Sequence, residues 1–361
     1  MTFHRIMRKY ETYECPKIDP QEVLNLIKID RMRHGGIMVN YACTAACRHC
    51  AYACSPTRSG GYMSEETAEQ TAKLLVSAGC RSIHIGGGEP LIDFEGLLKM
   101  LHIFSGAGIR IEYLETNAFW ANDADSEAKI KAIMKTGVDT LCISIDPYHA
   151  EYVPYERPLL LAEKCENTGM GYFLWKQQFL RMLSKLEADV PHTRMEMEAT
   201  LSKNYIADVA GMYGIGYNGR AVNIETEYCE KYPLQQSPQP SRNRLLSEAI
   251  LDNRPCRGLL AADHFHVDCE GYYIPQGCSG IRLPLEKIIG GISKNEYRIF
   301  QDLLHGGVAL IYEIAKEHGF TPDESGYPSK CNLCFHIRRF LSGFDYPELH
   351  AEHYTESLKY Y

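Results

Sequence analysis

Strand and helix signals alternate from Gly36 to Tyr228, and this alternation limits the fold more than any other feature of the chain. Short apolar runs that are typical of buried strands precede amphipathic segments with helical spacing. Repeated βα units with short links place their strands in parallel with right-handed crossovers. The predicted strands are Gly36–Asn40, Arg81–Ile85, Ile109–Leu114, Thr140–Ile145 and Tyr172–Trp175.

About six such units fit before Tyr228, which is too few for a closed eight-fold barrel. The sequence therefore predicts an α/β fold with an open, partial (β/α)6 barrel, TIM-like in architecture. The sixth unit, Met195–Ile224, has the weakest pattern, and Met195–Ala199 is compatible with either a strand or a helix.

Composition and charge limit the partners and the cellular location that the sequence is compatible with. The formal net charge is −8 and no long basic run occurs, which disfavours nucleic acid as a ligand. No run of about 18 apolar residues marks a membrane span. Met1–Tyr10 lacks the apolar core of a signal peptide. Fourteen cysteines without such a signal indicate a reducing, cytoplasmic compartment in which thiols bind metal.

Three cysteines stand on one short loop directly after the first predicted strand. Cys43, Cys47 and Cys50 have the spacing C-x3-C-x2-C. Three neighbouring thiolates can hold three irons of a four-iron cluster, and the fourth iron then keeps a position for another ligand. The alternative is three buried or zinc-binding cysteines. It is disfavoured because cysteine is scarce in ordinary cytosolic proteins.

Polar or glycine-rich residues follow the next three predicted strands as well. These segments are Gly86–Pro90, Glu115–Asn117 and Ser144–Asp146. In parallel α/β folds, functional sites form from the loops after the carboxyl ends of the strands. We therefore expect these segments to converge with the cysteine loop on one face.

The cysteine spacing, together with Gly86-Gly87-Gly88-Glu89-Pro90 some forty residues later, resembles the radical S-adenosylmethionine (SAM) superfamily. The resemblance implies a [4Fe-4S] cluster whose open iron chelates the amino and carboxylate groups of SAM. It also implies reductive cleavage of SAM to a 5′-deoxyadenosyl radical, and a low-potential electron donor such as flavodoxin or ferredoxin. One position departs from the family pattern, because His49 replaces the usual aromatic residue before the last cysteine.

The resemblance also suggests residues that contact SAM. His49 would stack on adenine, Glu89 would help to bind the ammonium group, Asp146 would accept from the ribose hydroxyls, and Arg220 would pair with the carboxylate. Apart from His49, each has an ordinary structural alternative as a turn, cap or surface residue. The full expected set is His49, Gly87, Gly88, Glu89, Thr116, Asn117, Ser144, Asp146 and Arg220. No catalytic residue is assigned.

A second cysteine set lies in the C-terminal third. Cys256 precedes, and Cys278 follows, a predicted β-hairpin over Phe265–Ile274 that turns at Glu270-Gly271. A C-x2-C pair, Cys331 and Cys334, comes later. This arrangement resembles the twitch domain, a short form of the SPASM auxiliary domain, which implies a second, auxiliary [4Fe-4S] cluster. Four thiolates suit zinc equally well, so zinc remains an alternative.

Two further cysteines lie close to these sets. Cys269, inside the predicted hairpin, is either a plain hairpin residue or an alternative ligand. Cys54 follows the main cysteine loop and is expected to pack as a small apolar residue.

A segment rich in proline and glutamine, Tyr232–Arg244, is typical of a linker. We therefore expect an N-terminal arm, a radical SAM barrel, a linker, an auxiliary α+β domain and a C-terminal tail, with the boundaries 1–35, 36–230, 231–253, 254–343 and 344–361.

The resemblance implies hydrogen abstraction from a substrate, and the size of one subgroup of relatives favours oxidative modification of a peptide or protein side chain. The arm is too short for the leader-peptide-binding domain of many such relatives, although a separate protein could supply one. Dehydrogenation or another radical modification of a small molecule such as an aminosugar is the alternative. A non-catalytic iron–sulfur electron carrier is the alternative from another class, and the glycine-glutamate motif disfavours it.

Overall fold

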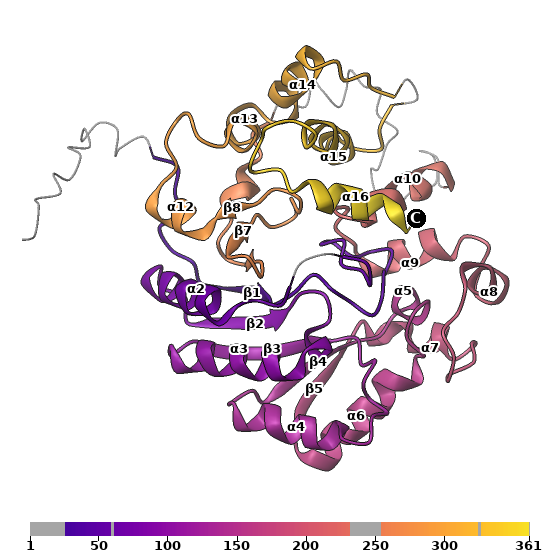
Figure 1. Cartoon of the computed structure of the whole chain (residues 1–361). Coiled ribbons are helices and arrows are strands. Elements are labelled where there is room, and N and C mark those ends of the chain that lie inside the picture. Colours follow the sequence, from indigo (N-terminus) through magenta and orange to yellow (C-terminus); the bar gives the residue numbers. More distant parts are fainter. Residues whose placement is uncertain (1–25, 59–60, 232–253, 324–325, 361) are drawn as a thin grey trace, which may run out of the picture.

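The computed structural model describes residues 26–58, 61–231, 254–323 and 326–360 (Figure 1). Most of the expected N-terminal arm and nearly all of the expected linker 231–253 lie outside the described residues. Of the arm, Ile27 forms a β-bridge with Ile292, and the last two residues already belong to the first strand.

Five parallel strands form the core sheet in the order β5-β4-β3-β2-β1. The α/β class and the parallel sheet predicted from the sequence are confirmed, and the strand ends differ from prediction by at most two residues. The strands are β1 (His34–Met38), β2 (Ser82–Gly86), β3 (Arg110–Thr116), β4 (Thr140–Ser144) and β5 (Gly171–Trp175).

Amphipathic helices follow these strands, and each buries one face against the core. Ser64 begins the first by accepting a hydrogen bond from the backbone N–H of Thr67, and Asp93 begins the second in the same way through Gly96. Gly169, in the left-handed conformation, ends the last. The helices are α2 (Glu65–Ser77), α3 (Phe94–Gly106), α4 (Ser126–Lys135) and α6 (Glu156–Thr168). Three short helices lie near the strand ends, η1 (Pro90–Ile92), α5 (Pro147–Ala150) and η2 (Gln177–Phe179), the last continuing into α7 (Leu180–Leu183).

The sixth unit differs from the expected βα pattern. Met195–Ala199 lies within helix α8 (Arg194–Thr200), which a reciprocal capping box between Thr193 and Glu196 begins. Helices α9 (Tyr205–Tyr213) and α10 (Ala221–Lys231) follow. The sixth parallel strand is instead β6 (Phe265–Val267), which pairs with β1 at the other edge of the sheet. The sequence predicted this strand as part of a hairpin, but local periodicity could not reveal its pairing with β1, because the two strands are more than two hundred residues apart.

The predicted hairpin is confirmed and extends the same sheet. β6 turns into β7 (Tyr272–Ile274), which pairs with β8 (Leu283–Pro284), so that eight strands form one continuous sheet. Asp268 Oδ1 holds the turn by accepting hydrogen bonds from the backbone N–H groups of Glu270 and Tyr272. The C-terminal third is therefore joined to the core by backbone hydrogen bonds.

Helices complete the C-terminal third and gather above the sheet in the view of Figure 1. The expected tail 344–361 contains α16, whose Glu356 accepts a 2.7 Å hydrogen bond from Ser55 beside the cysteine loop. It is therefore a docked helix, which the sequence reading missed. The elements are η3 (Arg257–Leu260), α12 (Leu285–Gly290), α13 (Arg298–Gly306), α14 (Val308–Glu317), α15 (Lys330–Leu341) and α16 (Ala351–Lys359).

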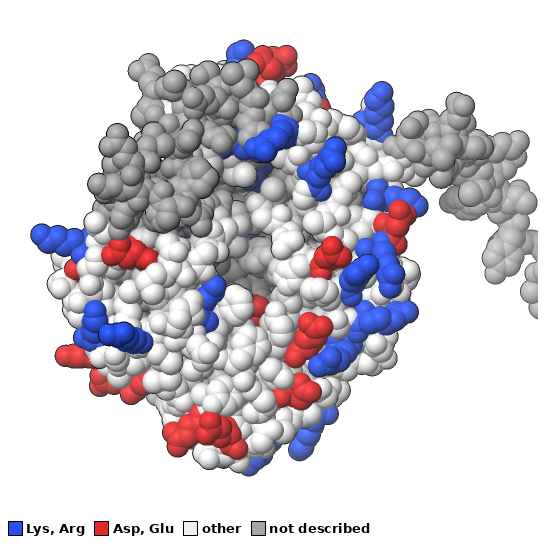
Figure 2. Space-filling model, turned by 180° about the vertical axis from the view of Figure 1, so that it is seen from behind, with Lys and Arg blue, Asp and Glu red and all other residues white. Residues whose placement is uncertain are grey.

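Among the described residues, no helix has the length and apolar character that crossing a membrane requires. On the face shown in Figure 2, acidic and basic side chains are interspersed, and the surface is hollowed near the centre.

Candidate functional site

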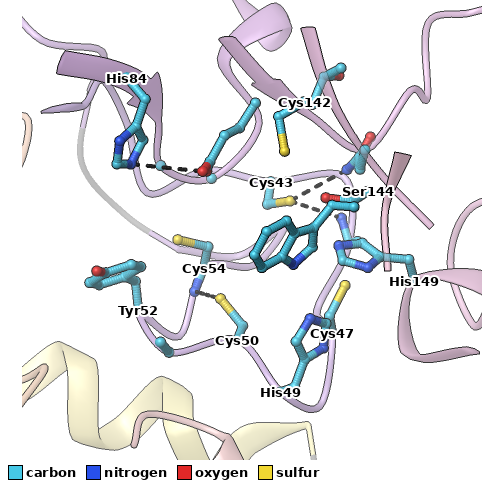
Figure 3. Close-up of a pocket in the computed structure, with 18 of the residues that line it drawn as sticks. Cys43, Cys47, His49, Cys50, Tyr52, Cys54, His84, Cys142, Ser144 and His149 are labelled. Atoms are coloured by element: carbon cyan, nitrogen blue, oxygen red, sulfur yellow. Dashed lines mark hydrogen bonds and ion pairs between the residues drawn. The ribbon is translucent and has the colours of Figure 1, made fainter. Parts of the chain in front are cut away.

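A cavity of about 470 Å³ lies at the inner face of the sheet and the carboxyl ends of its strands (Figure 3). Its volume falls in the usual range for small-molecule sites. It brings together most of the residues predicted from the strand ends, namely Cys43, Cys47, His49, Cys50, Gly87, Gly88, Thr116, Asn117 and Ser144. Three predicted residues, Glu89, Asp146 and Arg220, do not line it.

The three cysteines of the loop after β1 face this one cavity, as Figure 3 shows. The backbone N–H of Ala45 donates to Cys43 Sγ at 3.4 Å, and that of Cys54 donates to Cys50 Sγ at 3.3 Å. Such donors stabilise thiolates, the form that binds metal. Burial raises the pKa of the free thiols of Cys43 and Cys47, whereas a hydrogen bond from the Cys54 thiol lowers that of Cys50.

The glycine loop after β2 is packed directly against the cysteine loop. The backbone N–H of Gly88 donates to Asn40 O at 2.9 Å, and that of Glu89 donates to Ala42 O at 2.9 Å. A Cβ atom on Gly88 would lie 1.9 Å from Ala42 O. Glycine is therefore required here for close approach of the two loops, in addition to any approach of a ligand.

Glu89 has its contacts inside the protein. It is fully buried, and its carboxylate accepts hydrogen bonds from Thr116 Oγ1 at 3.0 Å and from the backbone N–H of Asn117 at 2.7 Å. Burial nevertheless raises its pKa to about 7. Glu89 thus joins the ends of β2 and β3, and its expected contact with an ammonium group has no support from this geometry.

Asn117 links the end of β3 to the cysteine loop. Its amide Nδ2 donates to Thr44 Oγ1 at 3.0 Å and lies 3.7 Å from Cys43 Sγ, within hydrogen-bonding reach of sulfur. Neighbouring Thr116 is buried and accepts from Trp120 Nε1 at 3.0 Å. The pair fixes the loop and lies at the cavity wall.

Asp146 was expected to bind ribose, and the structure places it elsewhere. Its carboxylate caps α5 by accepting from the N–H groups of Tyr148 and His149, and its Oδ2 lies 2.7 Å from His149 Nδ1. Burial alone would raise the pKa of Asp146, but the charge and hydrogen bonds of His149 hold it below its usual range. The helix-cap alternative is therefore the one observed. Ser144, two residues earlier, does face the cavity.

His49 lies at the cavity wall inside an aromatic group. Its ring stacks on Tyr148 with centroids 5.1 Å apart and lies 4.9 Å from the Tyr213 ring. Burial lowers its pKa to about 4, so the ring is neutral at pH 7. A neutral aromatic surface of this kind suits a flat ring as its neighbour.

Arg220 was expected to pair with the SAM carboxylate, but its side chain hydrogen-bonds to the backbone of the cysteine loop on the side away from the cavity. It is fully buried. Its guanidinium donates to Cys47 O at 3.0 Å and also to Cys54 O, while its backbone N–H donates to Cys50 O at 3.1 Å. Its partners are therefore backbone carbonyls of the loop and that of Glu356 on α16, to which its Nη1 donates at 3.5 Å, and it does not line the cavity.

Sequence reasoning missed a buried ion pair on the same loop. Arg48 Nε donates to both carboxylate oxygens of Glu151, at 2.8 and 3.0 Å, and Tyr205 OH donates to Glu151 at 2.7 Å. The two charged side chains are only 10% and 6% exposed. Nothing in the sequence pairs residues about a hundred positions apart. Inward-facing strand residues that line the cavity, such as Tyr113 and Cys142, were also missed, although their alternation along β3 and β4 carried the signal.

The second cysteine set also converges. A cavity of about 30 Å³ is lined by Cys256, Cys278, Cys331 and Cys334 together. The last two occupy the first turns of α15, which Ser329 begins, and a helix N-terminus favours thiolates. Cys269 is buried and lines neither cavity, as the plain hairpin alternative predicts.

Comparison with known proteins agrees with this geometry. Residues 37–163 match the family model of the Radical SAM superfamily. The chain carries a radical SAM domain. A segment of 118 residues is 27% identical to YydG of Bacillus subtilis (strain 168), a protein named for an unproven role in peptide biosynthesis, and covers 32% of this chain and 37% of that protein. The match therefore spans little more than a third of the curated relative.

The solved structures that the chain resembles include anSMEcpe with bound AdoMet. That match covers 86% of this chain and 96% of the other at a TM-score of 0.43 and 14% identity. SuiB of Streptococcus suis bound to S-adenosylmethionine covers 82% and 76% at a TM-score of 0.36 and 12% identity. At these TM-scores and identities, the solved structures give no information about function.

The residues of the radical SAM domain fit its family cofactors. Three thiols on one wall of a small-molecule-sized cavity match the donor set of a [4Fe-4S] cluster with one open iron. The four thiols of the second set match either an auxiliary cluster or zinc.

Proposed function

We propose that this protein is a radical SAM enzyme that oxidatively modifies a side chain of a peptide or protein. The cavity carries the proposal, because it combines three loop cysteines, the glycine loop and the polar ends of β3 and β4 in one space. A simple electron carrier does not need a cavity of this size beside its cluster.

In this proposal Cys43, Cys47 and Cys50 hold the cluster and the cavity admits SAM. Together these groups supply abstraction of a hydrogen atom from the substrate. Arg220 and Asn117 keep the cysteine loop in place through their hydrogen bonds.

The four cysteines at α15 would hold an auxiliary [4Fe-4S] cluster, with zinc as the alternative. An auxiliary cluster would accept an electron from the substrate, or it would hold the substrate in position. A flavodoxin or ferredoxin would deliver the first electron. The peptide substrate is favoured by the matched relative, whose name refers to peptide biosynthesis.

A direct assay tests the chemistry. Anaerobically reconstituted protein is mixed with SAM and dithionite, and 5′-deoxyadenosine is measured. We expect product from the wild type and from Cys80→Ser, a control at a buried cysteine outside the cavity, but none from Cys43→Ser. Equal product from Cys43→Ser would refute the enzyme assignment.

Metal analysis tests the cluster count. About eight irons and eight sulfides per chain support two clusters. About four of each together with zinc would assign the second set to zinc.

Mass spectrometry tests the substrate class. Small peptides encoded beside the gene are incubated with the active protein, and a loss of two hydrogens marks oxidation. If every such peptide is unchanged while an aminosugar loses hydrogen, the small-molecule alternative replaces the peptide.

A further inference from the structure

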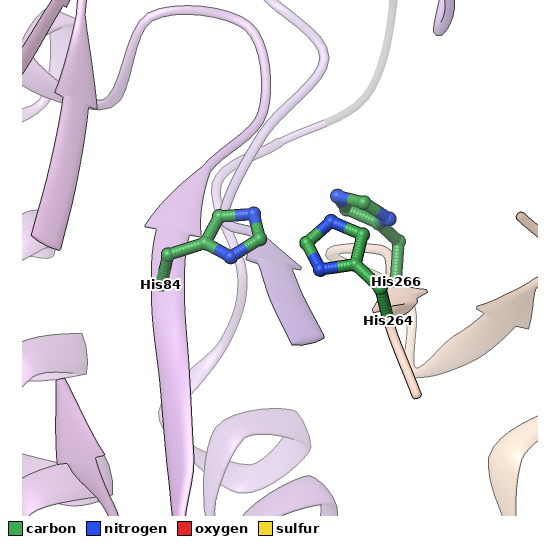
Figure 4. Close-up of side chains that lie close together, drawn as sticks. All are labelled: His84, His264 and His266. Carbon is green, nitrogen blue, oxygen red and sulfur yellow. The ribbon is translucent and has the colours of Figure 1, made fainter. Parts of the chain in front are cut away.

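Three histidines meet on the inner face of the sheet, in the part of the cavity away from Cys47 and His149 (Figures 3 and 4). His84 lies on β2, His266 on β6, and His264 just before β6. One ring nitrogen from each lies within 4.8 Å of the others. These rings come from segments about 180 residues apart, so the pairing of β6 with β1 creates the group.

The strand register explains why the rings converge. Gly36 on β1 is paired with His84 on one side and His266 on the other. A Cβ atom on Gly36 would lie 2.3 Å from His84 Nε2 and 2.7 Å from His266 Nε2. The absent side chain therefore leaves the space into which both nitrogens point.

The rings have contacts with one another but lack hydrogen-bond partners. Their centroids are 5.0 to 5.3 Å apart, and no hydrogen bond joins any of the three to another residue in the described part of the chain. His84 is only 4% exposed. Glu115 Oε1 lies 3.7 Å from its Nε2, which is too long for a hydrogen bond. All three residues line the cavity, so a ligand in the cavity can reach their ring nitrogens.

We propose that His84, His264 and His266 bind a divalent transition metal of the zinc type, with one coordination position open to the cavity. Three imidazoles with an open position are a known catalytic zinc arrangement. Zn–N bonds of about 2.0–2.1 Å place tetrahedral ligand nitrogens about 3.3 Å apart, so small ring rotations would close the group. The open position faces the same space as the radical SAM cysteines and can take a carbonyl or carboxylate oxygen of a bound molecule. This inference stands independently of the proposed enzymatic activity.

Metal binding to the intact protein tests the site. Protein with its iron–sulfur clusters reconstituted, and its cluster cysteines thereby occupied, is titrated with Zn²⁺ in the absence of SAM. We expect one equivalent of zinc, and at least ten-fold weaker binding in His264→Ala. His264 is only partly buried, so its removal disturbs the fold least. His102→Ala, which removes an exposed histidine of α3, is the matched control and should bind like the wild type.

X-ray absorption at the zinc edge provides a readout that needs no variant. A shell of nitrogen and oxygen neighbours alone is expected, whereas sulfur neighbours would place the zinc at cysteines and overturn the site. Equal affinity of the wild type and His264→Ala would also overturn it. Since neither measurement uses turnover, failure of the radical SAM assay would leave this result intact.

Discussion

Replacing Arg220 with alanine tests whether this buried arginine stabilises the cysteine loop or binds the carboxylate of SAM. The guanidinium donates to the carbonyls of Cys47 and Cys54, which lie on both sides of Cys50 in the sequence. A hydrogen bond to a charged group contributes about 1.5–3 kcal/mol, so the loss of two lowers the free energy of unfolding by about 3–6 kcal/mol. We therefore expect a less stable protein that incorporates less iron.

The assay is urea denaturation of the reduced, metal-free protein, followed by iron analysis after reconstitution. Arg110→Ala, at an exposed position that begins β3, is the control and should change stability by about 0.5 kcal/mol or less. If Arg220 instead bound the SAM carboxylate, stability and iron content would be unchanged and only the affinity for SAM would fall. That result would refute the inference that Arg220 stabilises the cysteine loop.

Three further substitutions test other parts of the site. Glu151→Ala leaves the Arg48 charge buried without its carboxylate, and denaturation should show a loss of about 3–5 kcal/mol; a loss below about 1 kcal/mol would contradict a buried pair. Cys278→Ser should remove about four irons from the reconstituted protein, whereas Cys269→Ser should remove none, and the reverse order would exchange their roles. Gly88→Ala forces the two loops apart and should reduce iron incorporation, so unchanged iron content would contradict their close packing.

Local sequence patterns predicted much of the core but little of how it is held together. The alternation of apolar runs located β1 to β5 within two residues, because each strand is a short local signal between turns. Cys43, Cys47 and Cys50 share a cavity, as their spacing on one loop predicted. The second set also shares a cavity, but that grouping was expected from the resemblance to the twitch domain.

The roles of single polar residues could not be predicted in this way. Asp146, Glu89 and Arg220 are residue types that suit a ligand, yet each is engaged by backbone groups or by a neighbour in the fold. Whether a carboxylate caps a helix or meets a ligand depends on the direction of one side chain, and a single sequence does not record that direction. The histidine group required the pairing of β6 with β1, which no local pattern indicates.

The docking of α16 has a consequence for biogenesis. Ser55 hydrogen-bonds to a residue 301 positions later, so the loop emerges from the ribosome long before the helix that closes over it has been made. A nascent chain displays the thiols of Cys43, Cys47 and Cys50 without that cover. Iron loading during translation would thus meet a different, more open loop than loading after release, and shortening the chain before Glu356 would leave every copy in the open form.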